Sequence, residues 1–470
     1  MKSDTLLYDK VAKNITELIN EGVLRPGSKI PSVRKLKSKM KVSASTVVQA
    51  YSLLEAKGLI EARPKSGYYV RFQANAPVPK TPVPATISIP LKISDFVASV
   101  LQSNQQPEVY PFGIAVPDAR LLPAKTLNRE LSAAARLAGE SGLQYDYPPG
   151  CQALRKQLSL RSLSWGNKLS PDEFITTSGT IDALGLALRA VTKPGDIVAV
   201  EAPTFFGILR LTEELGLKVL EIPVDPLSGP RLDILKTALS KNRISAFITI
   251  PNFQNPVGST MSDANKMRLI EISESYNLPI IEDDIYGDLH FGMFRPRTLK
   301  SFDKKGLVLL CSSISKSLAP GYRVGWIAPG KFKSRVALLK SIVSGETSTL
   351  TQIAIANFMK NGSYDRHLKW IRKSFEHNVQ VTRDTVIRYF PEGTKVSQPA
   401  GGFVLWIELQ QKMDSLKLQQ KALEKKISIA PGPIFSARKQ FKNYLRLSCG
   451  HRISTHTEAA IKKLATLIVN

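Results

Sequence analysis

The sequence contains little cysteine and little histidine, with 3 and 5 residues among 470. The three cysteines, Cys151, Cys311 and Cys449, lie far apart and form no CxxC pair. This argues against a disulfide framework and is typical of a reducing cytosol. The histidines show no spacing typical of metal ligands, so we expect no metal site.

Long hydrophobic runs are also missing. The first residues, Met1-Lys2-Ser3-Asp4-Thr5, lack the apolar segment of a signal peptide, and no apolar run approaches the length of a membrane span. These absences predict a cytoplasmic protein with no membrane partner. A chain of 470 residues is too long for one compact core, so we expect two or more domains.

Basic residues are in excess. There are 65 Lys and Arg against 39 Asp and Glu, which gives a formal net charge of +26. Residues 1–72 carry 14 basic and 6 acidic residues, or +8, and the rest of the chain carries +18. A polyanionic partner is one explanation and a basic proteome is another, and charge alone does not separate them.

Residues 1–72 have the pattern of a small helical module. Apolar residues recur at helical spacing over 7–18, and two further short helices are expected after Ser32 and Ser43, which are good N-caps. Two short helices joined by a tight turn are typical of a helix-turn-helix. The β-type segments 59–63 and 68–70 predict a hairpin that follows it.

Six motifs in this segment carry a resemblance to a known family. They are Leu24-x-Pro26-Gly27, Ile30-Pro31-Ser32-x-Arg34, Val42-Ser43-x-x-Thr46-Val47, Ala50-Tyr51-x-x-Leu54, Gly58 and Ser66-Gly67-Tyr68-Tyr69-Val70. Together they closely resemble the winged helix-turn-helix of GntR-type transcription regulators.

The resemblance implies double-stranded promoter DNA as a partner. The residues that it places at the DNA are Arg34, Ser43, Ser45, Thr46 and Gly67. Hydroxyls and amides at a helix N-terminus suit phosphates, and arginine can also read guanine edges. Ala44 stands where the family often has an arginine, so the sequence does not disclose the operator.

Residues 73–106 are predicted to be a proline-rich linker with an opening helix. Five prolines lie between Pro77 and Pro90 among Ala, Val and Thr, without periodicity. This composition favours an extended, semi-rigid tether. A helix is expected to begin near residues 93–98, before the second domain at 107–470.

The second domain alternates helical patterns with short apolar runs. The runs are 174–177, 197–200, 219–222, 246–250, 278–281 and 306–311. Repeated βα units predict an α/β fold with a large, mostly parallel sheet and helices on both faces. Ligands bind beyond the carboxyl ends of the strands in such sheets, so residues that follow these runs are candidates for a site.

Several of these strand ends carry polar or aromatic groups. Ser178-Gly179-Thr180 opens a helix and is either a phosphate cradle or an ordinary helix cap. Phe205 could stack on a planar ring or belong to the core, and Asn255 lies in a turn. Three consecutive carboxylates, Glu282-Asp283-Asp284, are costly at a strand end unless a cation such as a pyridinium faces them, and Tyr286 follows closely.

The segment Ser312-Ser313-Ile314-Ser315-Lys316 follows the last of these strands, and Arg323 comes shortly after it. Burial would disfavour the charged form of the lysine and make its amine nucleophilic. Hydroxyls and an arginine would suit a phosphate, and a lysine beside a phosphate site is what pyridoxal phosphate requires. Taken alone, the segment is equally compatible with a solvated surface loop.

Seven motifs in this domain appear in the order of a second known family. They are Tyr145-x-x-Pro148-x-Gly150-x-x-x-Leu154-Arg155, Ser178-Gly179-Thr180, Pro203-x-Phe205, Asn255-Pro256-x-Gly258, Asp283-x-x-Tyr286, Ser313-x-x-Lys316 with Arg323, and Leu445-Arg446-Leu447. They resemble the fold type I pyridoxal phosphate enzymes of the aspartate aminotransferase group, whose large sheet carries a smaller α+β subdomain. The resemblance covers nearly all of residues 107–470.

This resemblance implies a role for each matching residue. Lys316 would form the Schiff base, and Arg446 would bind a ligand carboxylate. Cofactor-binding residues would be Tyr145, Ser178, Gly179, Thr180, Phe205, Asn255, Asp283, Tyr286, Ser313, Lys316 and Arg323. Tyr145 would reach the phosphate of a neighbouring subunit, which implies a homodimer. Ala115 stands where the family usually has glycine, and its methyl group could crowd a substrate.

The combination of a GntR-type head, a linker and an aminotransferase-like domain resembles the MocR subfamily of bacterial regulators. It implies a pyridoxal-phosphate-dependent transcription regulator that senses an amino compound by Schiff-base exchange at Lys316. The alternative is a functional aminotransferase with an accessory DNA-binding module, since transaminase turnover is compatible with the same residues. A third interpretation, DNA binding beside an inactive cofactor domain, conflicts with the intact lysine motif.

Overall fold

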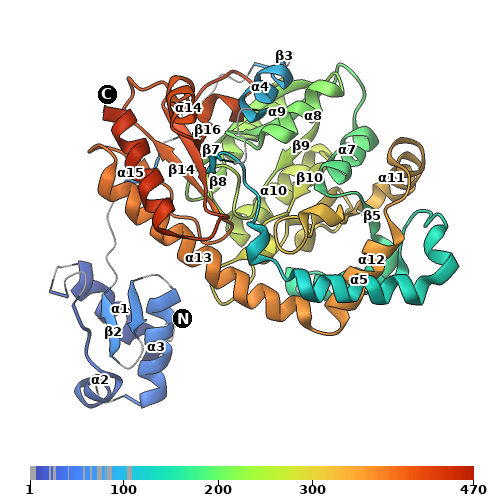
Figure 1. Cartoon of the computed structure of the whole chain (residues 1–470). Helices are drawn as coiled ribbons and strands as arrows, with labels where there is room; N and C mark the ends of the chain where they lie inside the picture. Colours follow the sequence, from blue (N-terminus) through green and yellow to red (C-terminus); the bar gives the residue numbers. More distant parts are fainter. Residues whose placement is uncertain are drawn as a thin grey trace. The chain divides into compact units, whose positions relative to one another are not determined.

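A computed structural model describes residues 7–20, 23–24, 28–40, 42–56, 59–63, 66–70, 77–79, 81, 87–90, 92–102 and 108–469. The chain divides into two compact units, one within Met1–Asn75 and one made of Ala76–His290 and Phe294–Asn470. Helices and strands of both units are labelled in Figure 1. No helix in the described ranges is long and apolar enough to cross a lipid bilayer.

The N-terminal unit is a winged helix-turn-helix. It consists of α1 (Leu7–Asn20), α2 (Val33–Met40), α3 (Ala44–Ala56), β1 (Ile60–Arg63) and β2 (Gly67–Val70), with β1 and β2 antiparallel. Its core packs Val11 and Ile15 of α1 against Leu36 of α2 and Val47 of α3. The Tyr51 hydroxyl donates a 2.5 Å hydrogen bond to the Pro31 carbonyl, and burial raises the pKa of Tyr51 to about 12. The predicted three helices and hairpin are confirmed.

The second unit is built on a nine-stranded sheet of order β3-β7-β6-β9-β10-β11-β12-β5, with β8 paired to β7. Its strands are β3 (Ile89–Pro90), β5 (Ile175–Thr177), β6 (Ile197–Ala202), β7 (Lys218–Asp225), β8 (Gly229–Pro230), β9 (Ile244–Thr249), β10 (Ile280–Asp283), β11 (Val308–Ser313) and β12 (Gly325–Ala328). The pairs from β7 through β11 are parallel. Strand β12 is antiparallel to both of its neighbours. Because the four pairs from β7 through β11 are parallel, the predicted mostly parallel sheet is confirmed.

Helices cover both faces of this sheet because successive strand residues point to opposite sides. Val198 and Val200 of β6 pack with α7 (Thr180–Val191) and α8 (Phe206–Glu214). Ala199, between them, packs with α9 (Leu232–Lys241) and α10 (Asp263–Tyr276). The strands are therefore apolar on both sides, which explains why they appear in the sequence as uninterrupted apolar runs.

A smaller α+β subdomain completes this unit. Its antiparallel sheet has the order β13-β14-β17-β16, formed by β13 (Lys395–Val396), β14 (Val404–Glu408), β16 (Ala430–Pro431) and β17 (Tyr444–Ser448). It is accompanied by α13 (Ser363–Tyr389), α14 (Ser415–Glu424) and α15 (Thr455–Val469). The long helix α13 contacts α15 and β14 at one end and α12 (Thr349–Lys360) at the other (Figure 1). A short parallel pair, β4 (Tyr110–Pro111) with β15 (Ile427–Ser428), ties the start of the domain to this subdomain.

The described parts of the linker are anchored to the second unit. The Pro77 carbonyl accepts a 3.2 Å hydrogen bond from the Val396 amide, and β3 adds an antiparallel edge strand to β7. Glu213 then caps α4 (Ser94–Gln102), since one of its carboxylate oxygens accepts 2.8 Å hydrogen bonds from the Ile93 and Ser94 amides. The predicted helix is present, and these described segments of the linker are held to the second unit by hydrogen bonds. Residues 73–76, 80, 82–86, 91 and 103–107 of the predicted linker lie outside the described residues.

Candidate functional site

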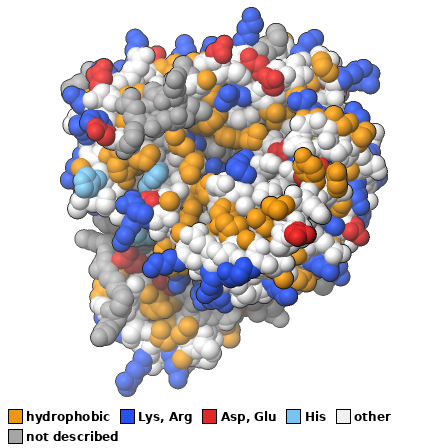
Figure 2. Space-filling view, turned by 45° about the vertical axis from the view of Figure 1, so that its right-hand side comes forward, with side chains coloured by type: hydrophobic (Ala, Val, Ile, Leu, Met, Phe, Trp, Pro, Cys, Tyr) orange, Lys and Arg blue, Asp and Glu red, His pale blue; other side chains and the backbone are white. Residues whose placement is uncertain are grey.

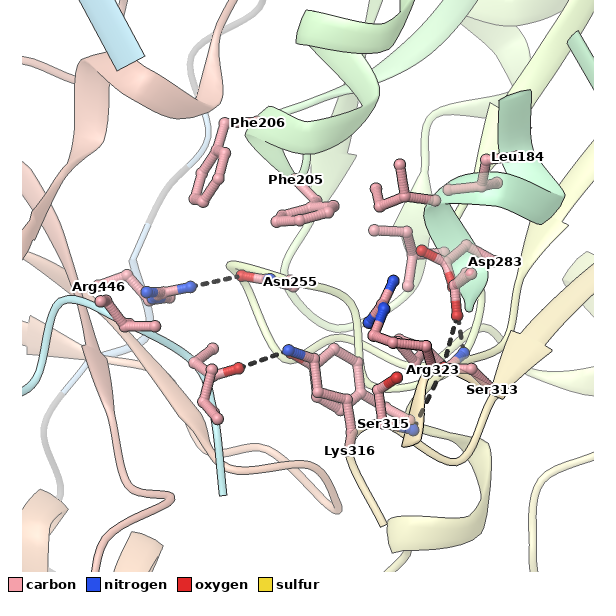
Figure 3. Close-up of a pocket in the computed structure, with 18 residues that line it drawn as sticks. Leu184, Phe205, Phe206, Asn255, Asp283, Ser313, Ser315, Lys316, Arg323 and Arg446 are labelled. Atoms are coloured by element: carbon pink, nitrogen blue, oxygen red, sulfur yellow. Dashed lines mark hydrogen bonds between the residues drawn. The ribbon is translucent and has the colours of Figure 1, made fainter. Parts of the chain in front are cut away.

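A cavity of about 300 Å³ lies beyond the carboxyl ends of the central parallel strands (Figure 3). Its lining comes from the start of α7, the turns after β6 and β9, the ends of β10 and β11, and β17. Nine residues that the sequence predicted for a site line this cavity: Thr180, Phe205, Asn255, Asp283, Tyr286, Ser313, Lys316, Arg323 and Arg446. The fold thus gathers groups that are widely separated along the chain.

Lys316 lies on the loop that follows β11. Its Nζ donates a 2.6 Å hydrogen bond to the Ala115 carbonyl, and no carboxylate of the described residues forms an ion pair with it. Burial and, to a smaller extent, the positive charge of Arg446 lower the pKa of Lys316 to about 8. A larger share of this amine is therefore neutral at pH 7 than for an exposed lysine, which favours its action as a nucleophile.

The three consecutive carboxylates separate because β10 alternates its side chains. Glu282 accepts hydrogen bonds from the Leu299 and Lys300 amides at 2.7 and 2.9 Å. Asp284, also on the far side of the strand from Asp283, binds Arg295.

Asp283 alone points into the cavity, where its Oδ1 accepts a 3.1 Å hydrogen bond from the Ile285 amide. No cation among the described residues forms an ion pair with it, and burial raises the pKa of Asp283 to about 7. A cationic ligand group that binds here would restore the ordinary ionised state of this carboxylate.

One end of the cavity forms an anion cradle. Thr180 Oγ1 donates a 2.9 Å hydrogen bond to Ser313 Oγ, and Thr180 is the first residue of α7. Arg323 Nη2 donates a 2.8 Å hydrogen bond to the Ser178 carbonyl. Gly179 has a φ of 101°, and a Cβ atom on it would lie 2.7 Å from the Arg323 guanidinium. Ser178 and Gly179 therefore flank the cradle without lining the cavity, and glycine is required for the close approach of Arg323.

Arg446, on β17, is 1% exposed and lies at the opposite end of the cavity from the cradle. Its guanidinium donates to the Gly113 carbonyl and, at 3.4 Å, to Asn255 Oδ1, and it lies 5.4 Å from the centre of the Phe435 ring. Its Nε has no hydrogen-bond partner, and no carboxylate of the described chain pairs with it. Burial lowers the pKa of Arg446 to about 10. A desolvated guanidinium without an acid is suited to bind a carboxylate from a ligand.

Tyr286, Asn255 and the aromatic residues form the wall between these two ends. The Tyr286 hydroxyl is buried and forms no well-shaped hydrogen bond with a described residue, and burial raises the pKa of this group. Phe205 faces the cavity beside Phe206, with their ring centres 4.7 Å apart. A Cβ atom on residue 207 would lie 2.4 Å from the Phe205 ring, so glycine there gives the ring its room.

Some residues that line this cavity were not among the predicted cofactor-binding residues. Ser315 lines it, and its buried hydroxyl has no partner among the described residues. Its position directly before Lys316 is the sequence feature that could have identified it as a cavity residue. Ile114, Ala115 and Phe206 form an apolar wall. Ala115 is buried and holds Lys316 through its carbonyl, so the position that departs from the family pattern lies inside the site.

Tyr145 does not reach this cavity in the single chain. It is 76% exposed and lies beside Tyr147, with ring centres 6.2 Å apart. Its predicted role, contact with the cofactor of a neighbouring subunit, stays a prediction.

Of the predicted DNA-contacting residues, Arg34, Ser43, Ser45 and Gly67 are exposed and Thr46 is half-buried. Arg34 is exposed on α2. Ser43 caps α3: its Oγ accepts a 3.0 Å hydrogen bond from the Thr46 amide and lies 2.7 Å from Ser45 Oγ. Gly67 begins β2 with a φ of 103°. The hydroxyls are thus grouped at a helix N-terminus, where phosphates bind.

Comparisons with known proteins agree with both units. Residues 7–70 match the bacterial regulatory proteins of the gntR family, and residues 116–465 match aminotransferase class I and II. The uncharacterized HTH-type transcriptional regulators YjiR and YdcR of Escherichia coli are 38% and 37% identical to this chain, and each match covers 98% of both proteins. The chain belongs to the GntR-type transcription regulators with an aminotransferase domain, the MocR architecture.

The aminotransferase part of this MocR-type regulator is also similar to proteins named as aminotransferases. The aromatic-amino-acid aminotransferase 1 of Thermococcus litoralis is 28% identical, over 79% of this chain and 91% of that protein. The kynurenine aminotransferase of Pyrococcus horikoshii, solved in complex with PMP, superimposes with a TM-score of 0.75 at 28% identity, over 81% of this chain and 95% of that one. LysN of Thermus thermophilus, complexed with N-(5'-phosphopyridoxyl)-L-leucine, has a TM-score of 0.73 at 25% identity, over 81% and 98%.

Proposed function

We propose that this regulator binds promoter DNA through its head and senses an amino compound with a carboxylate through pyridoxal phosphate held at Lys316. The observation that carries the proposal is Arg446, a buried guanidinium without an acid partner in the same cavity as a lysine of lowered pKa. A desolvated charge is costly unless it is paired. The pair of groups is suited to a ligand that carries both an amine and a carboxylate.

The cavity offers a suitable partner for each polar group of pyridoxal phosphate. When bound, this cofactor supplies an aldehyde that can exchange between amines. Asp283 would hold the ring nitrogen, Asn255 and Tyr286 the ring oxygen, and Phe205 would lie on the ring face. The phosphate would bind in the cradle formed by Gly179, Thr180, Ser313 and Arg323. The buried hydroxyl of Ser315 supports this fit, since it has no partner among the described residues and would gain one from the cofactor.

An effector amine would displace Lys316 from the cofactor. The released Nζ would have a hydrogen-bond acceptor within reach, because it lies 2.6 Å from the Ala115 carbonyl oxygen. Arg446 would meanwhile hold the effector carboxylate. The signal requires that the effector bind the two DNA-affinity states of the protein with different strengths.

We also propose that the regulator works as a homodimer. Leu143, Tyr145 and Tyr147 form an exposed apolar group on the segment before α6 (Gln152–Ser162), with Leu143 88% exposed. Exposed apolar groups of this kind are typical of protein interfaces, and a second subunit there would supply Tyr145 to its neighbour. Two heads on one dimer would gain affinity through effective concentration. The regulator would act in the cytoplasm, where promoter DNA is.

One experiment separates this proposal from turnover as an aminotransferase, which the similarity to characterised aminotransferases keeps open. The purified, cofactor-loaded protein is mixed with amino acids and a keto acid while absorbance and promoter binding are followed together. A regulator is expected to show a lasting spectral change and an altered DNA affinity without accumulation of product. Many turnovers of product with unchanged DNA affinity would contradict sensing.

Arg34→Ala is expected to weaken promoter binding about 10-fold, because a specific arginine contact to a base or phosphate contributes roughly 1–3 kcal/mol. Fluorescence anisotropy with labelled promoter DNA measures the change. Lys13→Ala is the matched control, since Lys13 is exposed on α1 and lies 4.0 Å from Glu17. Equal losses in the two variants would show that net charge alone, and not the α2 position, determines affinity.

The rate at which the cofactor-free protein takes up pyridoxal phosphate is expected to rise with pH, to be half-maximal near pH 8 and to level off about one pH unit higher. The attacking amine must be neutral, and the pKa of Lys316 is lowered to about 8 from an ordinary value of 10.5. Stopped-flow absorbance measures this rate. Arg446→Met removes a positive charge that lowers this pKa, so its plateau should move to higher pH. A wild-type rate that still rises steeply above pH 9 would contradict the assignment.

A further inference from the structure

A second polar surface lies on the aminotransferase-like unit, apart from the cofactor cavity. Two hollows of about 450 and 530 Å³ share Arg120 at their common edge. The first lies between the start of α5 (Ala124–Ala138) and the start of α13, and the second between the β4–β15 pair and the start of α15. We name both together the basic groove, defined by its cations Arg120, Arg129, Arg366, Lys425, Lys426, Arg452 and Lys463.

The charge of this groove is poorly compensated. Glu108 is the one acidic residue that lines it, and it pairs with Lys426. Arg120 pairs with Asp118 at 2.6 Å, and Arg129 lies 3.6 Å from Glu130.

Four cations remain without an acid partner in the described chain: Arg366, Lys425, Arg452 and Lys463. All four are exposed. They are therefore available to a polyanion without the rupture of an internal ion pair.

The groove also contains a histidine ring. His451 lines the second hollow, and its Nε2 is buried without a hydrogen-bond partner among the described residues. The other nitrogen of this ring donates to the Pro111 carbonyl, so Nε2 would donate to a phosphate oxygen when the ring is protonated, and the phosphate would favour that state. A phosphate seated there would lie close to Arg452, the next residue in the chain. The exposed ring of Trp370 lines the first hollow.

We propose that the basic groove binds backbone phosphates of the DNA that flanks the sequence read by the head. The proposal rests on the regulator function given above, since it requires that the head bring DNA to the protein. Residues 73–470 carry a net charge of +18, and Lys and Arg side chains clearly exceed Asp and Glu on the face shown in Figure 2. Duplex DNA presents one negative charge about every 1.7 Å along its axis, so two adjoining hollows with four free cations suit several phosphates at once. Such contacts carry no base information and extend the bound length of DNA.

The test compares two triple variants of the full-length, cofactor-loaded protein with the same change in charge. The groove variant is Lys425→Gln, Arg452→Gln and Lys463→Gln. The matched control is Lys412→Gln, Lys417→Gln and Lys421→Gln, three lysines that line a different hollow of the same subdomain. Affinity is measured against salt concentration for a long promoter fragment and for one trimmed to the sequence protected by the head. Cofactor absorbance and melting temperature verify that each variant is folded.

On the long fragment, the groove variant is expected to reduce the slope of log affinity against log salt by about 2–3, because each neutralised phosphate contributes about 0.9. On the trimmed fragment it should match the wild type, and the control should leave both slopes nearly unchanged. Equal losses in the two triple variants, or no loss in either, would overturn the proposal.

Inorganic pyrophosphate, titrated calorimetrically, distinguishes DNA from a small anion. If pyrophosphate binding is lost in the groove variant while the DNA slopes are unchanged, the groove belongs to a free phosphate compound and the proposal is wrong. Failure of the regulator function itself would look different, because wild-type protein would then bind neither fragment specifically and Arg34→Ala would have no effect.

Discussion

Lys316→Ala is expected to abolish both the absorbance of protein-bound cofactor and every effect of an amino compound on DNA affinity. The reason is chemical, since no other lysine lines the cavity and the alanine side chain has no amine. Basal DNA binding should persist, because the DNA-contacting residues belong to the separate N-terminal unit. Absorbance after extensive dialysis and anisotropy with promoter DNA measure the two outcomes on the same sample.

The control for this variant is Lys331→Ala. Lys331 is an exposed lysine that follows β12 and whose Nζ lies 3.1 Å from Asn277 Oδ1, outside the cavity. It should retain cofactor and effector response in full. If regulation by an amino compound survives in Lys316→Ala, the sensing mechanism is wrong. Loss of basal DNA binding in this variant would instead show that the cofactor is needed for assembly of the active regulator.

The second large effect is expected from Arg446→Met. Loss of one partner of a buried charge pair costs about 2–5 kcal/mol, so effector affinity should fall roughly 30-fold or more, since each 1.4 kcal/mol corresponds to a factor of ten. Cofactor binding should remain, because the groups suited to its ring and phosphate lie elsewhere in the cavity. Titration of the cofactor-loaded protein with amino compounds, followed by absorbance, gives the affinities.

Stability supplies an independent check on the same variant. Arg446 is buried without an acid partner, so its charge opposes folding in the absence of a ligand. Removal of that charge should leave the melting temperature of the effector-free protein equal or higher. Arg446→Lys is the control, because it keeps the charge and loses the two-pronged geometry that suits a carboxylate. A strongly destabilised Arg446→Met protein would indicate that the guanidinium is structural.

Lys316 and Arg446 were predictable from sequence because each lies in a short motif within a strand or just after one. The βα pattern gives the strand ends, and the ends of parallel strands meet at one edge, so Asp283 and Lys316 are expected to be neighbours. Strand alternation decides which of three adjacent carboxylates faces the cavity, but the sequence does not say which face that is. The partners of Glu282 and Asp284, which are the Leu299 and Lys300 amides and Arg295, come from later parts of the chain.

Other features depend on contacts that have no local signature. The linker was expected to be an extended, semi-rigid tether because of its proline-rich composition. That composition gives no sign of its hydrogen bond to Val396, a residue more than 300 positions away in sequence. The charge excess of the second unit was visible, yet its concentration in the basic groove depends on packing of β4, α13 and α15. Tyr145 remains the residue whose predicted role depends on a second copy of the chain.

In the proposed homodimer, the anchored linker would limit how far apart on DNA the two heads could bind. Strand β2 ends at Val70, and Pro77 is already fixed to Val396, so seven residue steps separate the two points. At about 3.3–3.6 Å per residue, this segment can span at most about 25 Å. The largest half-site separation that a dimer could bridge would therefore be set by the distance between the two Val396 residues and by the length of the two segments 70–77. Insertions within residues 71–76 would change the promoters that can be bridged, whereas changes within residues 80–86 would not.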